Sequence, residues 1–493
     1  MDIFYSPLPL YVVSAPLIAS VLILASGSAR PNLRESATII AALLQCVMVF
    51  AMLPPVLAGR VVVFRVIELY AGLSIMFSVD AFGMVFALLA SFLWVLVSIY
   101  SIGYMRSLNE HAQTRYFFCF ALALFGAVGV ALSGNLITLY MFYEILSVST
   151  YPLVAHKETP EAIRAGRKYL AYLLGGAVFL LFAMGATYSL TGTLDFASGG
   201  LFQGKGTSGM LRVIFACFMI GFGTKAALMP LHEWLPSAMI APTPVSALLH
   251  AVAVVKAGVF CVLRVILYVF GPEILRQMGL WEVLAYVASF TVIVANVIAL
   301  TQDNLKRRLA FSTINNLALI ILGAALLNAE AVRGAILLIP FHGFMKITLF
   351  MCAGAIYVMT GKELVSELQG IGRQMPVTMG AFTIGAAGLV GLPPVCGLLS
   401  KWYLCLGAFN SGEMLFLFVF LASALLDAAY FFPIIYNAYF RTGGREPVPV
   451  AEAPLLMTIP LAVSALFSVV LCFAPGALFG FFTLAELVIK TIF

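Results

Sequence analysis

Apolar residues occur along this chain in long runs, and short polar stretches separate them. A run of about 18 or more mainly apolar residues predicts a helix that spans a membrane. The stretch from Arg60 to Phe77 is too interrupted and too rich in β-branched residues for a span, and it predicts an extracytoplasmic hairpin. Elsewhere the runs predict about fourteen spans, at residues 4–26, 36–57, 79–105, 114–133, 135–155, 165–190, 209–236, 243–271, 280–301, 306–328, 331–360, 376–408, 414–440 and 454–482. The expected fold class is an all-α polytopic membrane protein.

The composition supports the same class. Of the 493 residues, 63% are hydrophobic and 10% are charged, whereas soluble domains are about half apolar. The net charge of +6 is scattered and includes no basic run of the kind that binds nucleic acid. The first apolar segment lacks a positive leader region and a cleavage signal, so we expect it to remain as the first span. The eight cysteines lie in apolar segments without a CxxC pair, so no disulfide scaffold, metal site or cluster is expected.

Lysine and arginine are unevenly distributed between the two sets of loops. If the N-terminus is outside, the inner loops hold Arg30, Arg34, Arg106, Arg115, Lys157, Arg164, Arg167, Lys168, Lys306, Arg307, Arg308, Lys362, Arg373, Arg441 and Arg445. The outer side then holds Arg60, Arg65, Lys205, Arg212, Arg276, Arg333 and Lys490. Because basic residues are enriched in cytoplasmic loops, this ratio of about two to one predicts that both termini lie outside.

Two segments of the chain resemble each other. Residues Glu161–Tyr188 align without gaps to Glu330–Tyr357, and the shared residues are Glu, Ala, Arg, a Leu, Gly, Ala and Tyr. The segments form the sixth and eleventh predicted spans, and elements five helices apart cross the membrane in opposite directions. This indicates two inverted five-helix repeats, spans 4–8 and 9–13, as in many secondary transporters. The expected regions are 1–110, with three helices and the hairpin, 111–272 and 273–440, with one repeat each, and 441–493, with a C-terminal helix.

Spans seven and twelve, also five apart, both contain residues that break helices. Proline inside a span removes a backbone donor and clashes with the preceding turn. The breaking residues are Pro230 and Pro236 in one span and Gly391, Pro393 and Pro394 in the other. Lys225 precedes the first break and Lys401 follows the second. Broken helices at matching positions in the two halves are typical of a translocation site.

Several ionisable residues fall well inside predicted spans: Glu144, Lys225, Lys256, Lys346 and Lys401, with His250 and His342 nearby. A charge at the bilayer centre costs about 2.5 to 3.5 kcal/mol, so four lysines facing lipid would cost roughly 10 kcal/mol. We therefore expect these side chains to face a hydrated interior. A buried lysine beside a carboxylate can gain or lose its proton near neutral pH, so this set is a candidate proton relay.

Each candidate also has a structural interpretation. Glu144 could form a structural ion pair with a lysine, and the histidines could make ordinary hydrogen bonds in the core. His250 and Lys256 are six positions apart, about 120° off one helix face, so direct contact is not expected. His342 and Lys346 are four apart and share a face.

Two other polar positions are excluded from the candidate set. Asp427 is expected to pair near Tyr436 or Arg441. His232 and Glu233 lie near the end of a broken helix, but HExxH spacing is absent, so a zinc site is not expected there.

Four motifs together resemble the antiporter-like subunits shared by Mrp cation/proton antiporters, respiratory complex I and membrane-bound hydrogenases. They are YEILSVSTYPLVAHK, PLHEWLPSAMIAPTPVSALLHAVAVVKAG, NLKRRLAFSTINN and GLPPVCGLLSK, within a similarity over about residues 80 to 440. The resemblance implies a fourteen-helix fold with inverted repeats, a Glu144–Lys225 pair, and an axis continued by Lys256 and Lys346 and ended by Lys401. It also implies that His250 and His342 help to connect that axis. The segment YPLVAHKETPEAIRAGRKYL is most similar to the Mrp D type and its hydrogenase relatives.

The resulting hypothesis is a proton-translocating subunit of a multi-subunit cation/proton antiporter or energy-converting redox complex in a bacterial or archaeal cytoplasmic membrane. It moves H⁺, with Na⁺ as the candidate exchanged ion, and its expected partners are other integral membrane subunits, including homologous ones. The alternatives are a complex I pump subunit driven by NADH:quinone oxidoreduction and a scaffold subunit without flux of its own. A complex I subunit of the type placed in the middle of its array is disfavoured, because that type tends to carry glutamate at the position of Lys401. The sequence contains no dinucleotide fingerprint, phosphate loop or haem or cluster ligand set, so no cofactor and no redox centre of its own is expected.

Overall fold

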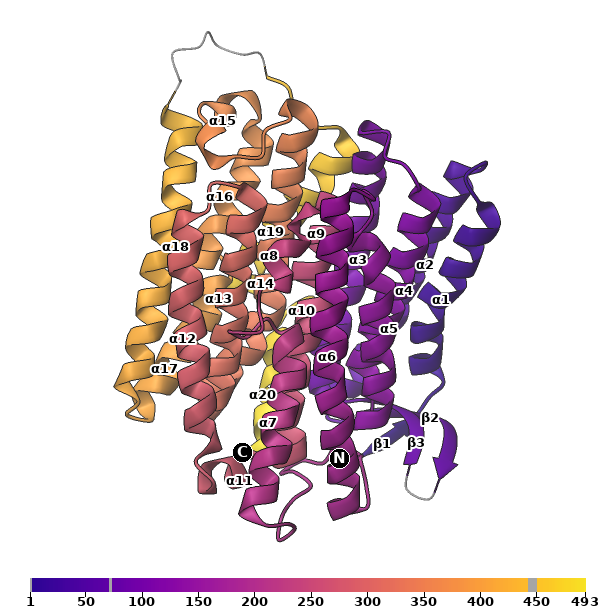
Figure 1. Ribbon diagram of the computed structural model, residues 1–493, viewed down its shortest axis with the longest axis vertical. Helices are drawn as coiled ribbons and strands as arrows, with labels where there is room; N and C mark the ends of the chain where they lie inside the picture. Colours follow the sequence, from indigo (N-terminus) through magenta and orange to yellow (C-terminus); the bar gives the residue numbers. More distant parts are fainter. Residues whose placement is uncertain (1, 71–72, 442–449) are drawn as a thin grey trace.

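The computed structural model describes residues 2–70, 73–441 and 450–493. Long helices stand roughly side by side along the long axis of the molecule, and both chain termini lie at its lower end (Figure 1). Twelve helices in the described ranges are long and apolar enough to cross a membrane. They are α1 (Leu8–Ser26), α2 (Pro31–Leu57), α3 (Ala81–Ser107), α4 (Gln113–Leu132), α6 (Pro160–Thr191), α7 (Ser208–Lys225), the segment Thr243–Phe270, α12 (Leu280–Thr301), α13 (Leu305–Ala325), α14 (Ala329–Thr360), α18 (Met414–Phe440) and α19 (Leu455–Phe473). The all-α polytopic class is therefore confirmed.

The two remaining predicted spans account for the difference between twelve and about fourteen. The span at 135–155 forms α5 (Leu136–Val154), which is helical but rich in polar residues, including Glu144 and Ser147. The span at 376–408 divides into α16 (Pro376–Val390) and α17 (Gly397–Asn410), with Gly391 in a left-handed conformation at φ 98° directly after α16. The break predicted in span twelve is thus present.

Span seven is broken as well. Helix α7 ends at Lys225, and the chain then turns through Pro230 into the short helix α8 (Trp234–Ser237) and the 3-10 helix η1 (Ala238–Ile240). Pro236 was expected to interrupt a long helix, but it lies within the short helix α8, because the long helix has already ended at Lys225. Lysine before one break and after the other agrees with the sequence prediction.

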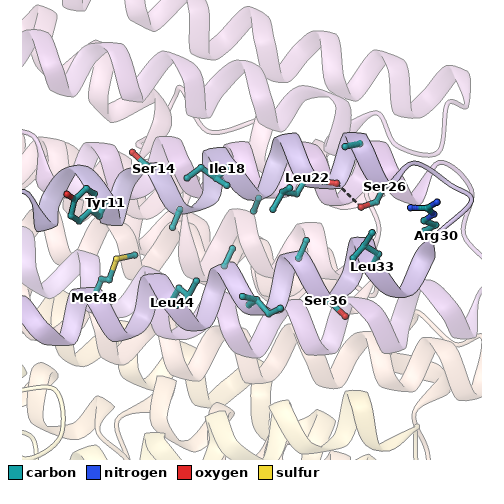
Figure 2. Close-up of a pocket in the computed structure, with 16 residues that line it drawn as sticks. Tyr11, Ser14, Ile18, Leu22, Ser26, Arg30, Leu33, Ser36, Leu44 and Met48 are labelled. Carbon is teal, nitrogen blue, oxygen red and sulfur yellow. Dashed lines mark hydrogen bonds between the residues drawn. The ribbon is translucent and has the colours of Figure 1, made fainter.

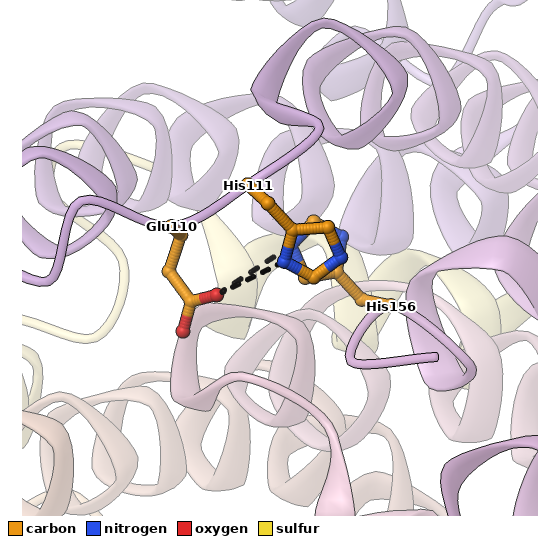
Figure 3. Close-up of side chains that lie close together, drawn as sticks. All are labelled: Glu110, His111 and His156. Carbon is orange, nitrogen blue, oxygen red and sulfur yellow. Dashed lines mark ion pairs between the residues drawn. The ribbon is translucent and has the colours of Figure 1, made fainter. Parts of the chain in front are cut away.

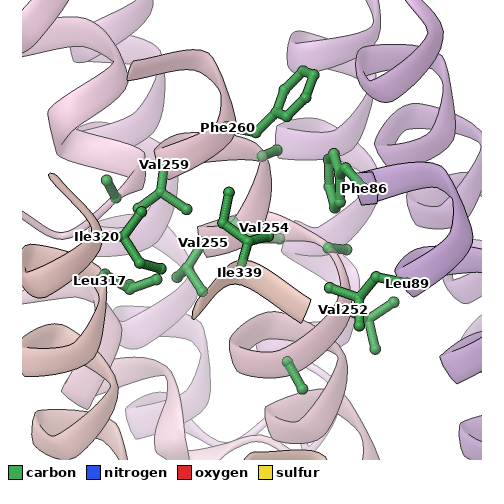
Figure 4. Packing of buried hydrophobic residues seen from close by; sticks show 14 of the residues in the cluster. Phe86, Leu89, Val252, Val254, Val255, Val259, Phe260, Leu317, Ile320 and Ile339 are labelled. Carbon is green, nitrogen blue, oxygen red and sulfur yellow. The ribbon is translucent and has the colours of Figure 1, made fainter. Parts of the chain in front are cut away.

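The next span, Thr243–Phe270, is irregular and central. It consists of α9 (Thr243–Ala247), the π-helical η2 (Leu248–Val252), α10 (Val254–Arg264) and the π-helical η3 (Val265–Phe270). Each of its residues is buried, and most of α13 and α14 is buried too. Figure 4 shows Val254 and Val255 of α10 packed beside Leu317 and Ile320 of α13 and Ile339 of α14. A π-helical turn inside a helix is frequently found at a functional site.

Helices α1 and α2 form the outer part of the bundle near the N-terminus. Their facing sides enclose an apolar groove of about 640 Å³ that runs from Tyr11 to Arg30 (Figure 2). The hairpin predicted at Arg60 to Phe77 is present as β2 (Val61–Tyr70) and β3 (Leu73–Val79), paired antiparallel with Phe64 opposite Phe77. Its residues 71 and 72 lie outside the described residues. The short strand β1 (Ile3–Tyr5) adds to β2 in parallel, where the sequence predicted the start of a span.

The C-terminal region differs from its prediction in one respect. The last span ends at Phe473, not near residue 482, and a separate helix α20 (Phe481–Ile492) follows and packs on α3 and α14. The turn between them carries Pro475 and Gly480, and Gly480 adopts φ 62° before α20. Residues 442–449, at the start of the predicted C-terminal region, lie outside the described residues. The remaining short elements are α11 (Pro272–Gln277), the 3-10 helix η4 (Val365–Glu367) and α15 (Ile371–Gln374).

Candidate functional site

Lys225 is the last residue of α7 and is completely buried. Its Nζ donates hydrogen bonds to the carbonyl oxygen of Tyr143 at 2.7 Å and to Oγ of Ser147 at 2.8 Å, both on α5. The same Nζ lies 3.1 Å from the centre of the Tyr143 ring. The ammonium group is therefore held by neutral oxygens and an aromatic face, and these contacts solvate a charge that lipid would reject.

Glu144 follows Tyr143 on α5 and is half-buried. The described residues contain no ion pair between Glu144 and Lys225, although their charges are close enough to interact. Oε1 of Glu144 is buried and has no hydrogen-bond partner among the described residues. The direct pair implied by the family resemblance is thus not formed in this structure.

Glycine explains how the next helix reaches the first break. A Cβ atom at Gly258 on α10 would lie 2.4 Å from the backbone nitrogen of Ala226, which directly follows Lys225. Only glycine permits this approach between α10 and the end of α7. Lys256, two residues earlier on α10, is thereby kept near the break.

Lys256 contacts His342 across the centre of the molecule. Its Nζ lies 2.7 Å from Nδ1 of His342 on α14, and both residues are completely buried. Nε2 of His342 and both ring nitrogens of His250 are buried without hydrogen-bond partners among the described residues. The ring of His250 packs 4.7 Å from that of Phe350. His250 therefore does not make the ordinary core hydrogen bond considered for the histidines, and within the described residues no hydrogen bond joins it to Lys256.

Lys346 continues the row on α14, one helical turn after His342. Its Nζ donates to the carbonyl oxygen of Leu309 on α13 at 3.1 Å and lies 5.8 Å from the ring of Phe431 on α18. The charges of Asp427 and Lys401 are close enough to act on it. Lys346 thus lies between the central contact and the second break.

Lys401 forms an ion pair with Asp427, 2.8 Å from Nζ to Oδ2. The expectation that Asp427 pairs near Tyr436 or Arg441 is wrong, because residue 427 is on the face of α18 turned towards the break. Nζ of Lys401 also donates to the carbonyl oxygens of Leu389 and Val390, which the end of α16 leaves without helical partners. The second break therefore supplies acceptors to its lysine.

A polar network around Asp427 was missed by the sequence reasoning. Oδ1 of Asp427 accepts from Nδ2 of Asn315 at 3.1 Å and from the hydroxyl of Tyr430. Oδ1 of Asn315 in turn accepts from the hydroxyl of Ser423 at 2.9 Å, and that hydroxyl accepts from Asn296 at 3.2 Å. Amide side chains inside apolar helices were the available signal, since a buried amide needs partners.

The predicted relay residues other than His250 thus fall into two groups. Lys225 and Glu144 lie at the first break, and Lys256, His342, Lys346 and Lys401 follow from the centre to the second break. Gly391 lies beside the second group, where a Cβ atom would be 3.1 Å from Cδ of Lys401. Pro393 and Pro394 occupy the loop before α17, and Pro230 occupies the loop after α7.

Two protein-family models match parts of this chain. A family model described as NADH:quinone oxidoreductase/Mrp antiporter, TM, matches residues 133–426. A second model, described as NADH-Ubiquinone oxidoreductase (complex I), chain 5 N-terminus, matches residues 70–117.

Individual relatives come from redox and antiporter complexes. The chain is 34% identical to NADH-quinone oxidoreductase subunit N of Desulforudis audaxviator, with 78% of this chain and 79% of the relative aligned. It is 32% identical to F(420)H(2) dehydrogenase subunit L of Methanosarcina mazei, with 79% of this chain aligned to only 62% of that relative's length. It is 26% identical to the D-type subunit of the Na(+)/H(+) antiporter of Bacillus subtilis, over 80% of this chain and 79% of the relative. These identities do not single out the Mrp D type, which stays a prediction.

Two solved structures share the fold over nearly the whole chain. A chain of the Mrp complex from Dietzia sp. DQ12-45-1b superposes with a TM-score of 0.87 at 21% identity, covering 99% of this chain and 97% of that one. A chain of the membrane-bound sulfane sulfur reductase, an archaeal respiratory membrane complex, gives a TM-score of 0.84 at 25% identity, covering 99% and 100%.

Proposed function

The chain belongs to the NADH:quinone oxidoreductase/Mrp antiporter family, and from this premise we propose that it is a proton-translocating, antiporter-like subunit of a multi-subunit membrane complex. The observation that carries the proposal is the series of four lysines, three completely buried and Lys401 11% exposed, each held by oxygen or imidazole acceptors, between two broken helices. Placing one charged side chain at the centre of the bilayer costs about 2.5 to 3.5 kcal/mol, so four such lysines are not expected in helices with a purely structural role.

The proposed path has two halves. One runs between Glu144 and Lys225, and the other runs from Lys256 through His342 and Lys346 to Lys401. Water is the natural carrier between them, since buried polar atoms without protein partners are normally satisfied by water. Both ring nitrogens of His250 and Nε2 of His342 are buried atoms without a hydrogen-bond partner among the described residues.

Charge coupling is the proposed switch. Two charges 4 Å apart interact by about 4 kcal/mol at an effective dielectric of 20, equivalent to roughly three pKa units of a lysine. Lys401 holds its carboxylate partner in this structure, while Lys225 is not in contact with one among the described residues. Formation of a Glu144–Lys225 contact would favour the charged lysine, and its loss would favour proton release towards Lys256.

The orientation proposed for the chain places both termini outside the cytoplasm of a bacterium or archaeon. Both termini lie at one end of the molecule, together with the β2–β3 hairpin (Figure 1). The loops rich in lysine and arginine belong to the opposite end, which the positive-inside rule assigns to the cytoplasm. The proposed regions remain 1–110, 111–272, 273–440 and 441–493, with the two central regions as inverted repeats. Helices α6 and α14, the sixth and eleventh spans, support this because each has 32 residues and each ends at a left-handed glycine.

The proposed partners are other integral membrane subunits, including homologous ones. Relatives named as subunits of a Na⁺/H⁺ antiporter, a quinone oxidoreductase and an F420H2 dehydrogenase support either an antiporter or a redox complex. Redox chemistry would reside in those partners. A scaffold subunit without flux of its own is the competing function, and it makes a different prediction for neutralising substitutions.

Lys225→Ala, in the intact complex in inverted membrane vesicles, tests the proposal. Proton movement, followed with a pH-sensitive dye, should fall at least ~10-fold, because the substitution removes the buried cation that ends α7 and is held by α5 at the first break. Lys205→Ala, an exposed lysine in the loop before α7, is the matched control and should leave transport unchanged. Unchanged flux in Lys225→Ala would exclude the relay, and loss of subunits from the purified complex after neutralising Glu144 or Lys401, with flux per complex intact, would favour the scaffold. Repeating the assay with an imposed Na⁺ gradient tests the exchanged ion.

A further inference from the structure

Two loops at the end opposite the termini bring together three side chains that can bind a metal. The loop between α3 and α4 carries Glu110 and His111, and the turn between α5 and α6 carries His156. One ligand atom from each lies within 4.8 Å of the others. The two imidazole rings lie 4.8 Å apart and are tilted by 32°, and Figure 3 shows one nitrogen of each directed towards the same carboxylate oxygen of Glu110. None of these residues takes part in the proposed proton path.

The distances suit an ion better than direct bonds. Oε2 of Glu110 lies 3.9 Å from Nδ1 of His111 and 3.8 Å from Nε2 of His156, both too long for hydrogen bonds. Around tetrahedral zinc, with bonds of about 2.0 to 2.1 Å, ligand atoms are roughly 3.3 Å apart. To reach that spacing from the present 3.8 and 3.9 Å, the carboxylate of Glu110 has to move as well as the ring of His111, whose side chain is 47% exposed.

His156 gives the second, independent observation. Its side chain is 0% exposed, and neither ring nitrogen has a hydrogen-bond partner among the described residues. A buried imidazole without partners is costly, and its two nitrogens would normally be satisfied. A neutral imidazole offers a nitrogen lone pair for a ligand bond, and both ring nitrogens of His156 are without a protein partner among the described residues.

The surroundings allow access and balance charge. A cavity of about 460 Å³ lined by Glu110, Gln113 and Arg34 opens beside the cluster, so an ion and a water ligand could enter. Arg115 donates to the carbonyl oxygen of His156 at 3.2 Å and is itself paired with Glu158. That pairing neutralises the nearest positive charge and leaves Glu110 to balance the ion.

We propose that Glu110, His111 and His156 form a binding site for a divalent transition metal, with Zn²⁺ as the best fit, that ties the α3–α4 loop to the α5–α6 turn. Two imidazoles and one carboxylate are a ligand set that zinc accepts with water in the fourth position. Magnesium and calcium are disfavoured, because they require mainly oxygen ligands. The site departs from the sequence expectation that the chain has no metal ligands, since His156 is far from Glu110 and His111 in the sequence.

Zinc binding to the full-length chain, purified in detergent and stripped with chelator, tests the proposal. A titration with ZnCl₂ against a chromophoric competing chelator should show one saturable site per chain, and Co²⁺ should give the absorption of a four-coordinate ion. Glu110→Gln and His156→Leu should weaken binding at least ~100-fold, while His232→Ala, a histidine elsewhere on the chain, should bind as the parent does.

His111→Ala keeps the test decisive even if replacing buried His156 impairs folding, because the side chain of His111 is 47% exposed and its loss should preserve the fold. Zinc should raise the unfolding temperature of the parent chain and raise it less in His111→Ala. Absence of saturable binding by the parent would overturn the proposal. Parent-like binding by His111→Ala and Glu110→Gln together would overturn it as well.

Discussion

The ion pair between Lys401 and Asp427 gives the most exacting test of how the second break works. Asp427 is completely buried and Lys401 is 11% exposed, so the two partners respond differently to loss of the other. Lys401→Met leaves a buried carboxylate with only the amide of Asn315 and the hydroxyl of Tyr430, and removing one partner of a buried pair costs about 3 to 5 kcal/mol. Asp427→Asn leaves Lys401 the carbonyl oxygens of α16, so its cost should be nearer 1 to 3 kcal/mol, roughly that of an imperfectly satisfied polar group.

The double variant separates a coupled pair from two independent contacts. In Lys401→Met with Asp427→Asn, neither member of the pair is charged, so adding the second substitution should recover stability lost by the first. The measurement is unfolding of the detergent-purified complex by heat and by denaturant, with proton transport in vesicles recorded for the same variants. Transport should fall at least ~10-fold in all of them, because the relay needs an ionisable lysine there.

Glu413→Gln, at the start of the same helix as Asp427, is the matched control, because no ion pair involves it among the described residues. It should change neither stability nor transport. Additive losses of stability in the double variant would refute the pairing, since independent sites add and coupled sites do not. Parent-like transport by Asp427→Asn would refute the role of the pair in the relay.

Two further predictions concern close packing and a buried pair away from the axis. Gly258→Ala places a Cβ atom 2.4 Å from the backbone nitrogen of Ala226, so thermal unfolding should show a loss of about 1 to 3 kcal/mol of stability. In the control Gly175→Ala, the new Cβ has no atom within 4 Å, and stability should be unchanged or higher. Equal stability changes in the two variants would contradict the role given to close packing at Gly258. In the parent chain the buried Arg264 donates to Oδ1 of Asp80 at 2.6 Å, and Asp80 also caps α3. Asp80→Asn keeps an oxygen for the cap but removes the counter-charge of Arg264, so the complex should lose about 3 to 5 kcal/mol of stability. An unchanged unfolding midpoint would show that the pair is dispensable.

Hydropathy determined most of the architecture. Bilayers demand long apolar helices with internally satisfied backbones, so most spans could be read from the hydropathy pattern; the ends of the seventh and fourteenth spans were placed about ten residues too far along the chain. The positions of both helix breaks followed from proline and glycine, whose backbone effects are local. The cost of burying charge also made lysine inside a span visible as a candidate without any structure. The ends of the chain were less accurate: β1 and α20 were not expected, because short strands and short amphipathic helices depend on the surfaces that cover them.

Partners of the buried charges could not be predicted from sequence alone. Lys256 and His342 are 86 positions apart, and only the packing of α10 against α14 brings them within 2.7 Å. Asp427 was assigned to neighbours on its own helix, although its partner lies on α17 beyond the second break. Local patterns describe which residues share a helix face but not which helix that face meets.

The sequence by itself determined the membrane class, the helix breaks and the identity of the candidate proton carriers. These follow from single-residue properties: transfer free energy, backbone freedom and charge. Tertiary structure alone decided that Lys401 pairs with Asp427, that Lys225 is held by neutral oxygens and a ring, and that His156 meets Glu110 across two loops. Such pairings depend on how helices that are far apart in the sequence pack against one another, and no local property of the chain encodes that packing.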